Sequence, residues 1–288
     1  MGLNEMSDIF GYKNYENSAS VKSQETFSIY TPEEIVAMKA KMTDPKALPK
    51  KADDYVLHNP SISEFKIKEL ENSFAISPLK LHDGLYRVEW SKELLDEDKR
   101  HTQDEWNLIL QGSEWSLPSG QLYCATLEAL YRNKDGNYKT VIEKLNGIFS
   151  NDFANHFMIT STRIKYPAVG LDEIIHDYGS ASKYEIQIDF VGNNGIVNSE
   201  SGFEDPIESL LGTGDLTEVE EVFEWVSGRK PYLWRLGGKP KNDTMLTLLL
   251  GGDNVRFSID AVGRIGNVRP ARGVVRSKIS TGNKGNGK

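Results

Sequence analysis

The residues best suited to acid–base or metal chemistry are few and far apart in the chain. The five histidines are His58, His82, His101, His156 and His176. No two of them have the spacing by which a helix or a strand presents a pair of metal ligands. Cys124 is the single cysteine, so the chain can form neither an internal disulfide nor a multi-cysteine zinc site. We therefore predict no metal and no cofactor, and we expect Cys124 to be a small buried residue on a helix.

The adjacent His176 and Asp177 could act as a general base and its supporting carboxylate. A surface or loop histidine is the simpler interpretation of this pair. The glycine-bearing segments 192–195 and 212–214 do not join a strand to a helix as a phosphate-binding loop does, and the sequence has no nucleophile-elbow or dinucleotide motif. The motifs therefore favour a protein that is not an enzyme.

Side chains alternate in character along the segment 254–262, near the C-terminus. The apolar residues Val255, Phe257, Ile259 and Ala261 would point to one side of an extended chain. The residues between them would point to the other side: Asn254, Arg256, Ser258 and Asp260. We expect the apolar side to face a core and the polar side to face solvent, where it can change without disturbing the core. Any half-exposed strand would show this pattern, and that plainer interpretation stays open.

The elements that must position this segment form blocks of strands and helices. Strands are predicted at 65–81 and 84–90, joined by a turn at His82-Asp83-Gly84, and again at 157–166 and 184–191. Helices are predicted at 121–132 and 138–153, from Asp205 onward, and at 217–226, where Gly228 ends the last one. Strand-like pieces follow at 232–236, 245–250, 254–262 and 267–275. The sequence thus predicts an α+β fold with an antiparallel sheet completed at the end of the chain.

The two ends of the chain differ from its central part. Residues 1–54 read as an arm with a short helix, started by Thr31-Pro32-Glu33-Glu34, and a linker. Residues 55–278 form the expected domain, and 279–288 form a flexible tail. No apolar run is long enough to span a bilayer, so we expect no membrane insertion. The polar start lacks the apolar centre of a secretory signal.

The net charge of −8 is unevenly distributed. From Arg229 onward the chain has 13 Lys and Arg against 3 Asp and Glu, whereas the part before it has 21 against 39. Such asymmetry favours a basic recognition face on an acidic body. Tyr232, Trp234 and Phe257 lie among these arginines, and such a combination can stack nucleic-acid bases. We expect no nucleic-acid partner, because the apolar residues alternate as core residues do and the whole chain is negative.

Three short motifs carry a resemblance to a known fold. Trp115-Ser116-Leu117-Pro118 before a helix resembles the W-x-L-P element of the formylglycine-generating-enzyme type of C-type-lectin fold. Tyr232-Leu233-Trp234-Arg235 looks like the Tyr/Trp strand of that fold, and the segment 267–274 is similar to its closing V-R-P-V-R-G strand. The order of the motifs agrees, while the long interval between Pro118 and Tyr232 implies a helical insert. Within this fold the layout resembles the variable proteins of diversity-generating retroelements, especially those of archaea and their viruses.

The resemblance implies a C-type-lectin-like domain with a hypervariable ligand-binding segment at about 232–275. By position, its ligand-binding residues would be Asp253, Asn254, Arg256, Ser258, Asp260, Arg264, Ile265 and Asn267. Its scaffold residues would be Trp234, Val255, Phe257, Ile259 and Val268. Arg269 and Arg272 fit either exposed contacts or buried arginines that bind carbonyl groups. The resemblance does not extend to the enzymatic branch of the family, which needs paired cysteines or a copper site, or to calcium-dependent sugar binding.

We therefore expect a non-enzymatic protein that binds a protein or cell-surface ligand, is diversified by a retroelement, and acts on a virion or a cell surface. Two alternatives stay open. One is a lectin-like surface or envelope domain without diversification. The other is an enzyme of unknown class, whose activity would depend on His176 or Cys124.

Overall fold

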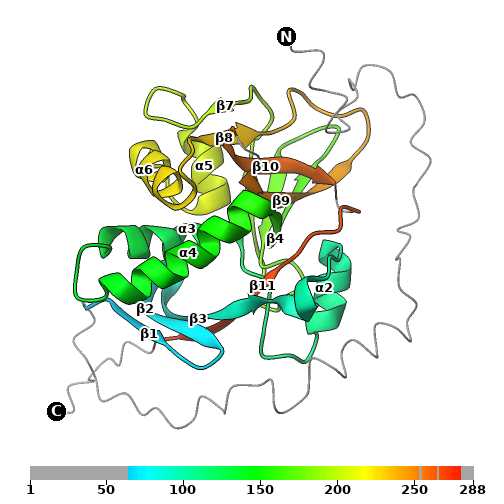
Figure 1. The fold of residues 1–288 in the computed structure, drawn as a ribbon. Coiled ribbons are helices and arrows are strands. Elements are labelled where there is room, and N and C mark those ends of the chain that lie inside the picture. Colours follow the sequence, from blue (N-terminus) through cyan, green and yellow to red (C-terminus); the bar gives the residue numbers. More distant parts are fainter. Residues whose placement is uncertain (1–63, 253–254, 265, 280–288) are drawn as a thin grey trace, which may run out of the picture.

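The computed structural model describes residues 64–252, 255–264 and 266–279. The predicted arm, 1–54, and nearly all of the predicted tail, 279–288, lie outside the described residues. Within the described part the chain forms two sheets, largely antiparallel, with helices packed between and around them (Figure 1). The predicted α+β class is thereby confirmed.

The first sheet joins the start of the described chain to its end. β1 (Lys66–Glu69), β2 (Ser73–Leu81) and β3 (Gly84–Leu94) form successive hairpins, and β11 (Arg272–Lys278) pairs antiparallel with β3. The predicted turn at His82-Asp83-Gly84 connects β2 to β3. Lys278, the last residue of β11, forms an ion pair with Asp83 in this turn, with Nζ and Oδ2 2.9 Å apart. Residues almost 200 positions apart in the chain (83 and 278) thus meet at one end of the first sheet.

The second sheet contains the predicted recognition segment. Its strand order is β6-β5-β4-β9-β10-β8-β7. The strands are β4 (Phe157–Tyr166), β5 (Asp172–His176), β6 (Tyr184–Ile188), β7 (Gly195–Ile196), β8 (Pro231–Trp234), β9 (Thr244–Gly252) and β10 (Phe257–Arg264). β8 pairs with β10 in parallel, and the other neighbours pair antiparallel. β10 is therefore an inner strand with a hydrogen-bonded neighbour on each side.

Helices α3 (Gly120–Arg132) and α4 (Lys139–Asn155) run across the centre of the molecule between the two sheets (Figure 1). Leu127 and Phe149 on these helices are fully buried in one core with Trp90 of β3 and Phe257 of β10. α5 (Glu204–Leu211) packs against α3, and α6 (Leu216–Ser227) packs against α3 and α4. Ser119 caps α3 by accepting a hydrogen bond from the backbone N–H of Leu122. Gly228 ends α6 at a φ of 68°, which suits glycine.

A smaller apolar cluster covers the other side of the second sheet. The 3₁₀ helix η3 (Leu95–Asp98) leads from β3 toward α2 (Gln103–Leu110), and Trp106 of α2 packs with Ile159 of β4 and Leu249 of β9. Trp106 Nε1 donates a hydrogen bond to the carbonyl oxygen of Arg269 at 2.9 Å. The backbone N–H of Ile159 donates to the carbonyl oxygen of Pro270 at 3.2 Å. These bonds hold the segment 267–271 across the sheet, so the sheet is covered on both sides near its centre.

One strand and one helix were not predicted from the sequence, and one strand begins later than expected. β5 was not predicted, because its five residues are too few to show alternation. The helix α2 was not predicted either; it begins with a capping box formed by Thr102 and Glu105. The closing strand was predicted at 267–275 but begins only at Arg272. Pro270 has no backbone N–H to donate to a neighbouring strand, and the segment that contains it lies across the sheet instead of pairing as a strand.

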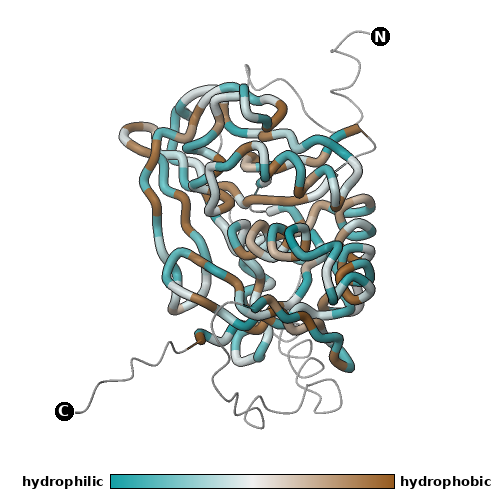
Figure 2. Tube along the Cα trace, turned by 90° about the vertical axis from the view of Figure 1, so that its left-hand side faces the viewer, coloured by the Kyte–Doolittle hydropathy of each residue, from teal (hydrophilic) through white to brown (hydrophobic). Residues whose placement is uncertain are grey.

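Among the described residues no helix is long and apolar enough to cross a membrane. Apolar stretches are short and alternate with polar ones along the described trace (Figure 2).

Candidate functional site

The polar side of β10 is the predicted recognition face, and the structure buries its centre. Ser258 and Asp260 are only 4% and 6% exposed, so the expectation that they face solvent is wrong. Ser258 is flanked by Tyr232 on β8, and Asp260 is flanked by Trp234 on the same strand. The alternation in this segment separates two different buried environments, because other parts of the chain cover both sides of β10.

Asp260 is a carboxyl group inside this covered region. Its Oδ1 accepts a hydrogen bond from the backbone N–H of Val262 at 2.9 Å. Burial raises the pKa of Asp260 to about 6, while the hydrogen bond from Val262 and the charge of Arg269 act to lower it. A carboxyl group placed in this way has a structural role and is not free to vary as a surface residue would be.

The other predicted ligand-binding positions differ in exposure. Arg264, at the end of β10, is exposed. Asn267 is half-buried, and its backbone N–H donates to the carbonyl oxygen of Arg264 at 2.9 Å. Asp253, Asn254 and Ile265 lie outside the described residues. Arg256, just before β10, is half-buried.

Arg256 stacks on two aromatic side chains. Its guanidinium carbon lies 4.4 Å from the ring centre of Tyr232 and 5.2 Å from that of Trp234. The two ring centres are 4.7 Å apart. Tyr232 and Trp234 are two residues apart on β8, so both side chains lie on one side of the sheet. We call Tyr232, Trp234 and Arg256 the aromatic–arginine surface. All three side chains are half-buried, so each is held in place and still accessible.

A groove of about 520 Å³ lies beside the aromatic–arginine surface. It is lined by Ile196, Glu224, Gly228, Arg229, Lys230, Tyr232, Val255 and Arg256. Val255 is 69% exposed and Ile196 is 47% exposed. Val255 was expected to be part of the scaffold, and this is wrong because β10 begins only at Phe257. Exposed apolar side chains next to arginine and aromatic rings are typical of a contact surface.

The two arginines of ambiguous role have different environments. Arg272 is buried, and its Nε and Nη2 donate to the carboxylate of Asp152 on α4. Its Nη1 donates to the carbonyl oxygens of Ser91 and Lys92, at 3.1 and 2.7 Å. Arg272 is therefore a buried arginine that binds carbonyl groups. Arg269 is half-buried, and its Nη1 donates to the carbonyl oxygen of Val268 at 2.9 Å.

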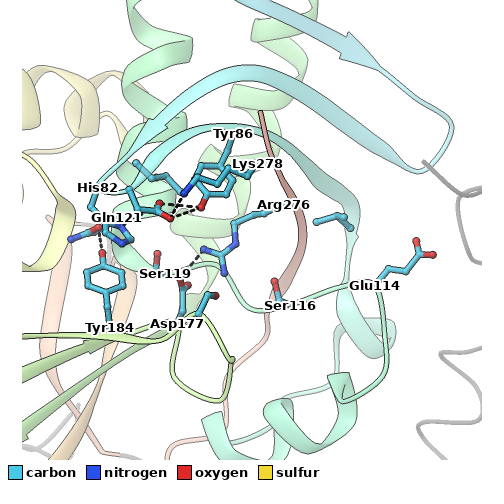
Figure 3. A pocket seen from close by; sticks show the side chains of 14 residues that line it. His82, Tyr86, Glu114, Ser116, Ser119, Gln121, Asp177, Tyr184, Arg276 and Lys278 are labelled. Atoms are coloured by element: carbon cyan, nitrogen blue, oxygen red, sulfur yellow. Dashed lines mark hydrogen bonds and ion pairs between the residues drawn. The ribbon is translucent and has the colours of Figure 1, made fainter. Parts of the chain in front are cut away.

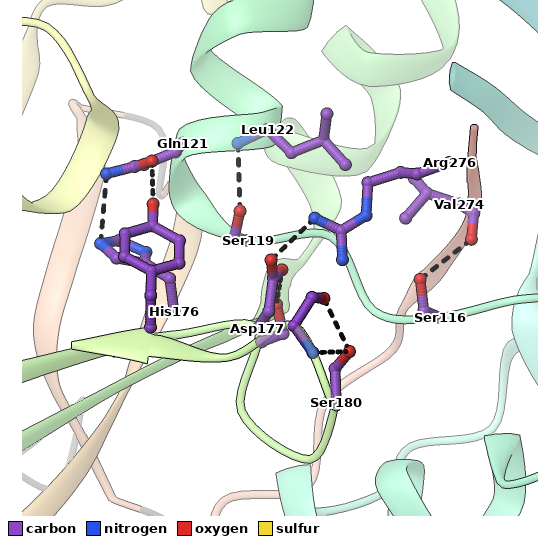
Figure 4. A network of polar contacts seen from close by, with 12 residues as sticks. Ser116, Ser119, Gln121, Leu122, His176, Asp177, Ser180, Val274 and Arg276 are labelled. Carbon is purple, nitrogen blue, oxygen red and sulfur yellow. Dashed lines mark hydrogen bonds and ion pairs between the residues drawn. The ribbon is translucent and has the colours of Figure 1, made fainter. Parts of the chain in front are cut away.

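His176, the histidine considered as a base, is buried at the end of β5 (Figure 4). Its Nε2 lies 2.8 Å from the carbonyl oxygen of Ser209, which can only accept, so we assign the ring hydrogen to Nε2. Nδ1 then accepts from the hydroxyl group of Thr162, 3.1 Å away. Burial lowers the pKa of His176 to about 4, against the raising effects of Ser209 and Asp177. Asp177 binds Arg276 (Figure 4), so the two residues do not form a base with its supporting carboxylate.

Cys124 is buried on α3, as predicted. Burial raises the pKa of its thiol, and the carboxylate of Glu128 raises it further, so the thiol stays protonated and is a poor nucleophile. In the part of the chain that the structure describes, no group of three or more His, Cys, Asp and Glu side chains is placed to hold a metal ion.

Comparison with protein-family models, with curated proteins and with solved structures finds no match. The function of this chain must therefore be inferred from its own residues and geometry.

Of the aromatic–arginine surface, sequence reasoning predicted only Arg256 as a ligand-binding residue. Tyr232 and Trp234 were both considered as base-stacking residues, and Trp234 was also expected to be part of the scaffold. The available signal was the spacing Tyr232-Leu233-Trp234, which puts two aromatic rings on one side of a strand around the buried Leu233. Their contact with Arg256 depends on the parallel pairing of β8 with β10, which no local pattern indicates.

Proposed function

We propose that this chain is a non-enzymatic binding protein that contacts a protein or cell-surface ligand through the aromatic–arginine surface. The observation that carries this proposal is the stacking of the Arg256 guanidinium on the rings of Tyr232 and Trp234. Tyrosine, tryptophan and arginine are the residues that most often dominate the free energy of protein–protein binding.

The stacking also lowers the entropic cost of binding. A free arginine side chain loses rotamer freedom when a partner fixes it, and this opposes association. Here the two rings already restrict Arg256, and β8 restricts the rings. A planar guanidinium can bind a carboxylate through two parallel hydrogen bonds, so a carboxylate of the partner suits this position.

The surroundings favour a partner surface that combines acidic and apolar groups. Arg229 and Lys230 line the neighbouring groove together with Glu224, and Lys230 Nζ lies 2.7 Å from Glu220. Val255 and Ile196 offer apolar contacts in the same groove. An acidic side chain next to an aliphatic or aromatic one would match both features.

We further propose a C-type-lectin-like scaffold for the described domain. The segment that resembles the W-x-L-P element leads directly into α3, and the Tyr/Trp motif forms β8. The segment that resembles the closing strand ends in β11, which pairs with β3 near the start of the domain. The interval between Pro118 and Tyr232 contains α5 and α6, as the resemblance requires of an insert.

If a retroelement diversifies this chain, the burial of Ser258 and Asp260 restricts which positions can change. We propose that variation falls on Asp253, Asn254, Arg256, Arg264, Ile265 and Asn267, which flank the buried part of β10 in the sequence. A neighbouring reverse transcriptase gene, with a template repeat that differs from the end of this gene only at adenines, would support this. A repeat that alters the codons of Phe257 or Ile259 as often as that of Arg256 would contradict it.

The binding function can be tested with a displayed library of random peptides selected on the immobilised full-length chain. We expect the selected peptides to be enriched in Asp, Glu and aromatic residues. The substitution Arg256→Gln should weaken the binding of these peptides by about 30-fold or more. The matched control is Arg132→Gln on α3, an exposed arginine paired with Glu218, which should leave affinity unchanged. Peptides that bind the Arg256→Gln protein as tightly as the parent would refute the proposed surface.

A further inference from the structure

A second cavity, of about 370 Å³, lies where the two sheets meet (Figure 3). One wall is formed by the first sheet, with Asp83 at the turn between β2 and β3 and Tyr86 on β3. The opposite wall is formed by the second sheet, with Asp177 after β5 and Tyr184 on β6. Arg276 of β11 reaches between the walls toward Asp177 (Figure 3). This volume is in the range of sites for small ligands.

The charges in the centre of this cavity are paired with one another. Arg276 Nη1 lies 2.8 Å from Asp177 Oδ2, and Lys278 Nζ lies 2.9 Å from Asp83 Oδ2. Asp177 is 4% exposed, and it turns toward Arg276 from a left-handed backbone conformation with a φ of 51°. The Arg276–Asp177 pair is largely buried, whereas Lys278 and Asp83 are exposed. A charged ligand would have to break the buried pair or add an uncompensated charge beside it. A neutral ligand carries neither cost.

The same groups keep hydrogen-bonding capacity for a ligand. Among the described residues the Arg276 guanidinium makes one hydrogen bond, although it carries five N–H donors. The hydroxyl group of Tyr86 donates to Asp83, so its oxygen can still accept. Ser119 is buried and lines the cavity, and its oxygen accepts from the backbone N–H of Leu122, so its hydrogen can still donate. The cavity thus offers both donors and acceptors, and a ligand hydroxyl group, which donates and accepts at once, matches such a lining.

A stack of aromatic rings connects the two walls. The rings of His82 and Tyr184 are 3.7 Å apart between centres, and those of Tyr184 and His176 are 4.9 Å apart. The Tyr184 hydroxyl group also donates to Gln121 at the start of α3. Because His82 belongs to the first sheet and Tyr184 to the second, this stack holds the two walls of the cavity in a fixed relation.

We infer that this cavity binds a neutral, hydroxyl-rich ligand of the size of one or two sugar rings, held by direct hydrogen bonds from both sheets. This inference does not depend on the aromatic–arginine surface, which involves other residues of the second sheet.

The test uses the full-length chain and saturation-transfer NMR with defined probes. The neutral probes are maltose, N-acetylglucosamine and mannitol, and the charged counterparts are glucuronate and glucosamine. We expect transfer to at least one neutral probe in the millimolar range, and weaker transfer to the charged ones. Tyr86→Phe and Asp83→Asn, tested singly, should each weaken the binding of the neutral probe by about tenfold, because each changes one hydrogen-bonding group of the wall. Asn suits the turn position of Asp83, so this change should leave the turn intact.

The control Tyr232→Phe removes a hydroxyl group from the aromatic–arginine surface and should leave saccharide binding unchanged. Three results would overturn the inference: no transfer to any neutral probe, stronger transfer to the charged probes, or equal transfer in the Tyr86→Phe and Asp83→Asn proteins. Thermal unfolding of each variant shows whether a loss of transfer results from unfolding of that variant. If the saccharide test fails, the peptide-binding proposal for Arg256 is unaffected, because the two experiments use different variants and different probes.

Discussion

Asp260 shows how a single buried carboxyl group can make the stability of a protein depend on pH. Burial raises its pKa in the folded protein to about 6, above the usual aspartate value of 3.8. The folded state therefore holds this proton more tightly than the unfolded state does. The stabilisation is complete below the unfolded pKa and is lost as the pH rises through about 6. Above that value the fold carries the cost of a buried charge, reduced by Val262 and Arg269.

The change Asp260→Asn removes this titration while keeping the size of the side chain. We expect the free energy of unfolding of Asp260→Asn, relative to the parent, to increase by up to about 3 kcal/mol between pH 4 and pH 7. Urea unfolding at a series of pH values measures this difference. A difference for Asp260→Asn that stays constant between pH 4 and pH 7 would contradict the raised pKa.

At the scale of the elements, the start of α3 is fitted closely against its neighbours. A Cβ atom on Gly120 would lie 2.8 Å from the carbonyl oxygen of Leu210 on α5 and 2.5 Å from a methyl carbon of Leu248 on β9. Gly147, in the middle of α4, has nothing within 4 Å of the same added atom. The two glycines therefore test packing and helix propensity separately.

Alanine substitutions at these two glycines should change stability in opposite directions. We expect Gly120→Ala to lower the free energy of unfolding by about 1–3 kcal/mol, because the backbone of α5 must shift. We expect Gly147→Ala to raise it by about 0.5–1 kcal/mol, because alanine restricts the unfolded chain and favours the helix. Urea unfolding of both proteins provides the comparison. A gain of stability from Gly120→Ala would show that α5 does not lie where the structure places it.

At the scale of the whole molecule, Arg272 joins parts of the chain that are far apart in sequence. It belongs to β11, donates to the carbonyl oxygens of Ser91 and Lys92 at the end of β3, and forms a buried ion pair with Asp152 of α4. This one side chain thus connects the first sheet to the central helices. Its partners are 120 and about 180 positions away in the sequence.

Removal of the Arg272 side chain should lower the free energy of unfolding, because it leaves the buried carboxylate of Asp152 without its partner. We expect Arg272→Met to lower the free energy of unfolding by about 3–5 kcal/mol, and the double change Arg272→Met with Asp152→Leu to recover part of that loss. The matched control is Arg132→Gln, which breaks an exposed ion pair and should cost no more than about 1 kcal/mol. A loss below about 1 kcal/mol for Arg272→Met would mean that the ion pair with Asp152 is not formed.

The sequence by itself determined the features that depend on neighbouring residues. The end of α6 at Gly228, the turn between β2 and β3, and the buried positions of Phe257 and Ile259 were predicted correctly. Each of these depends on local backbone conformation or side-chain periodicity within one element, and a few consecutive residues determine such features.

The tertiary structure alone decided which predicted surface is accessible. Alternation along β10 shows that Ser258 and Asp260 lie opposite to Phe257 and Ile259, but it cannot show what covers that opposite side. The parallel pairing with β8 and the path of the segment 267–271 across the sheet decide this, and both are contacts between distant parts of the chain. For the same reason the cavity between the sheets could not be predicted: Asp83, Asp177 and Arg276 meet only when the first and last strands of the domain pair.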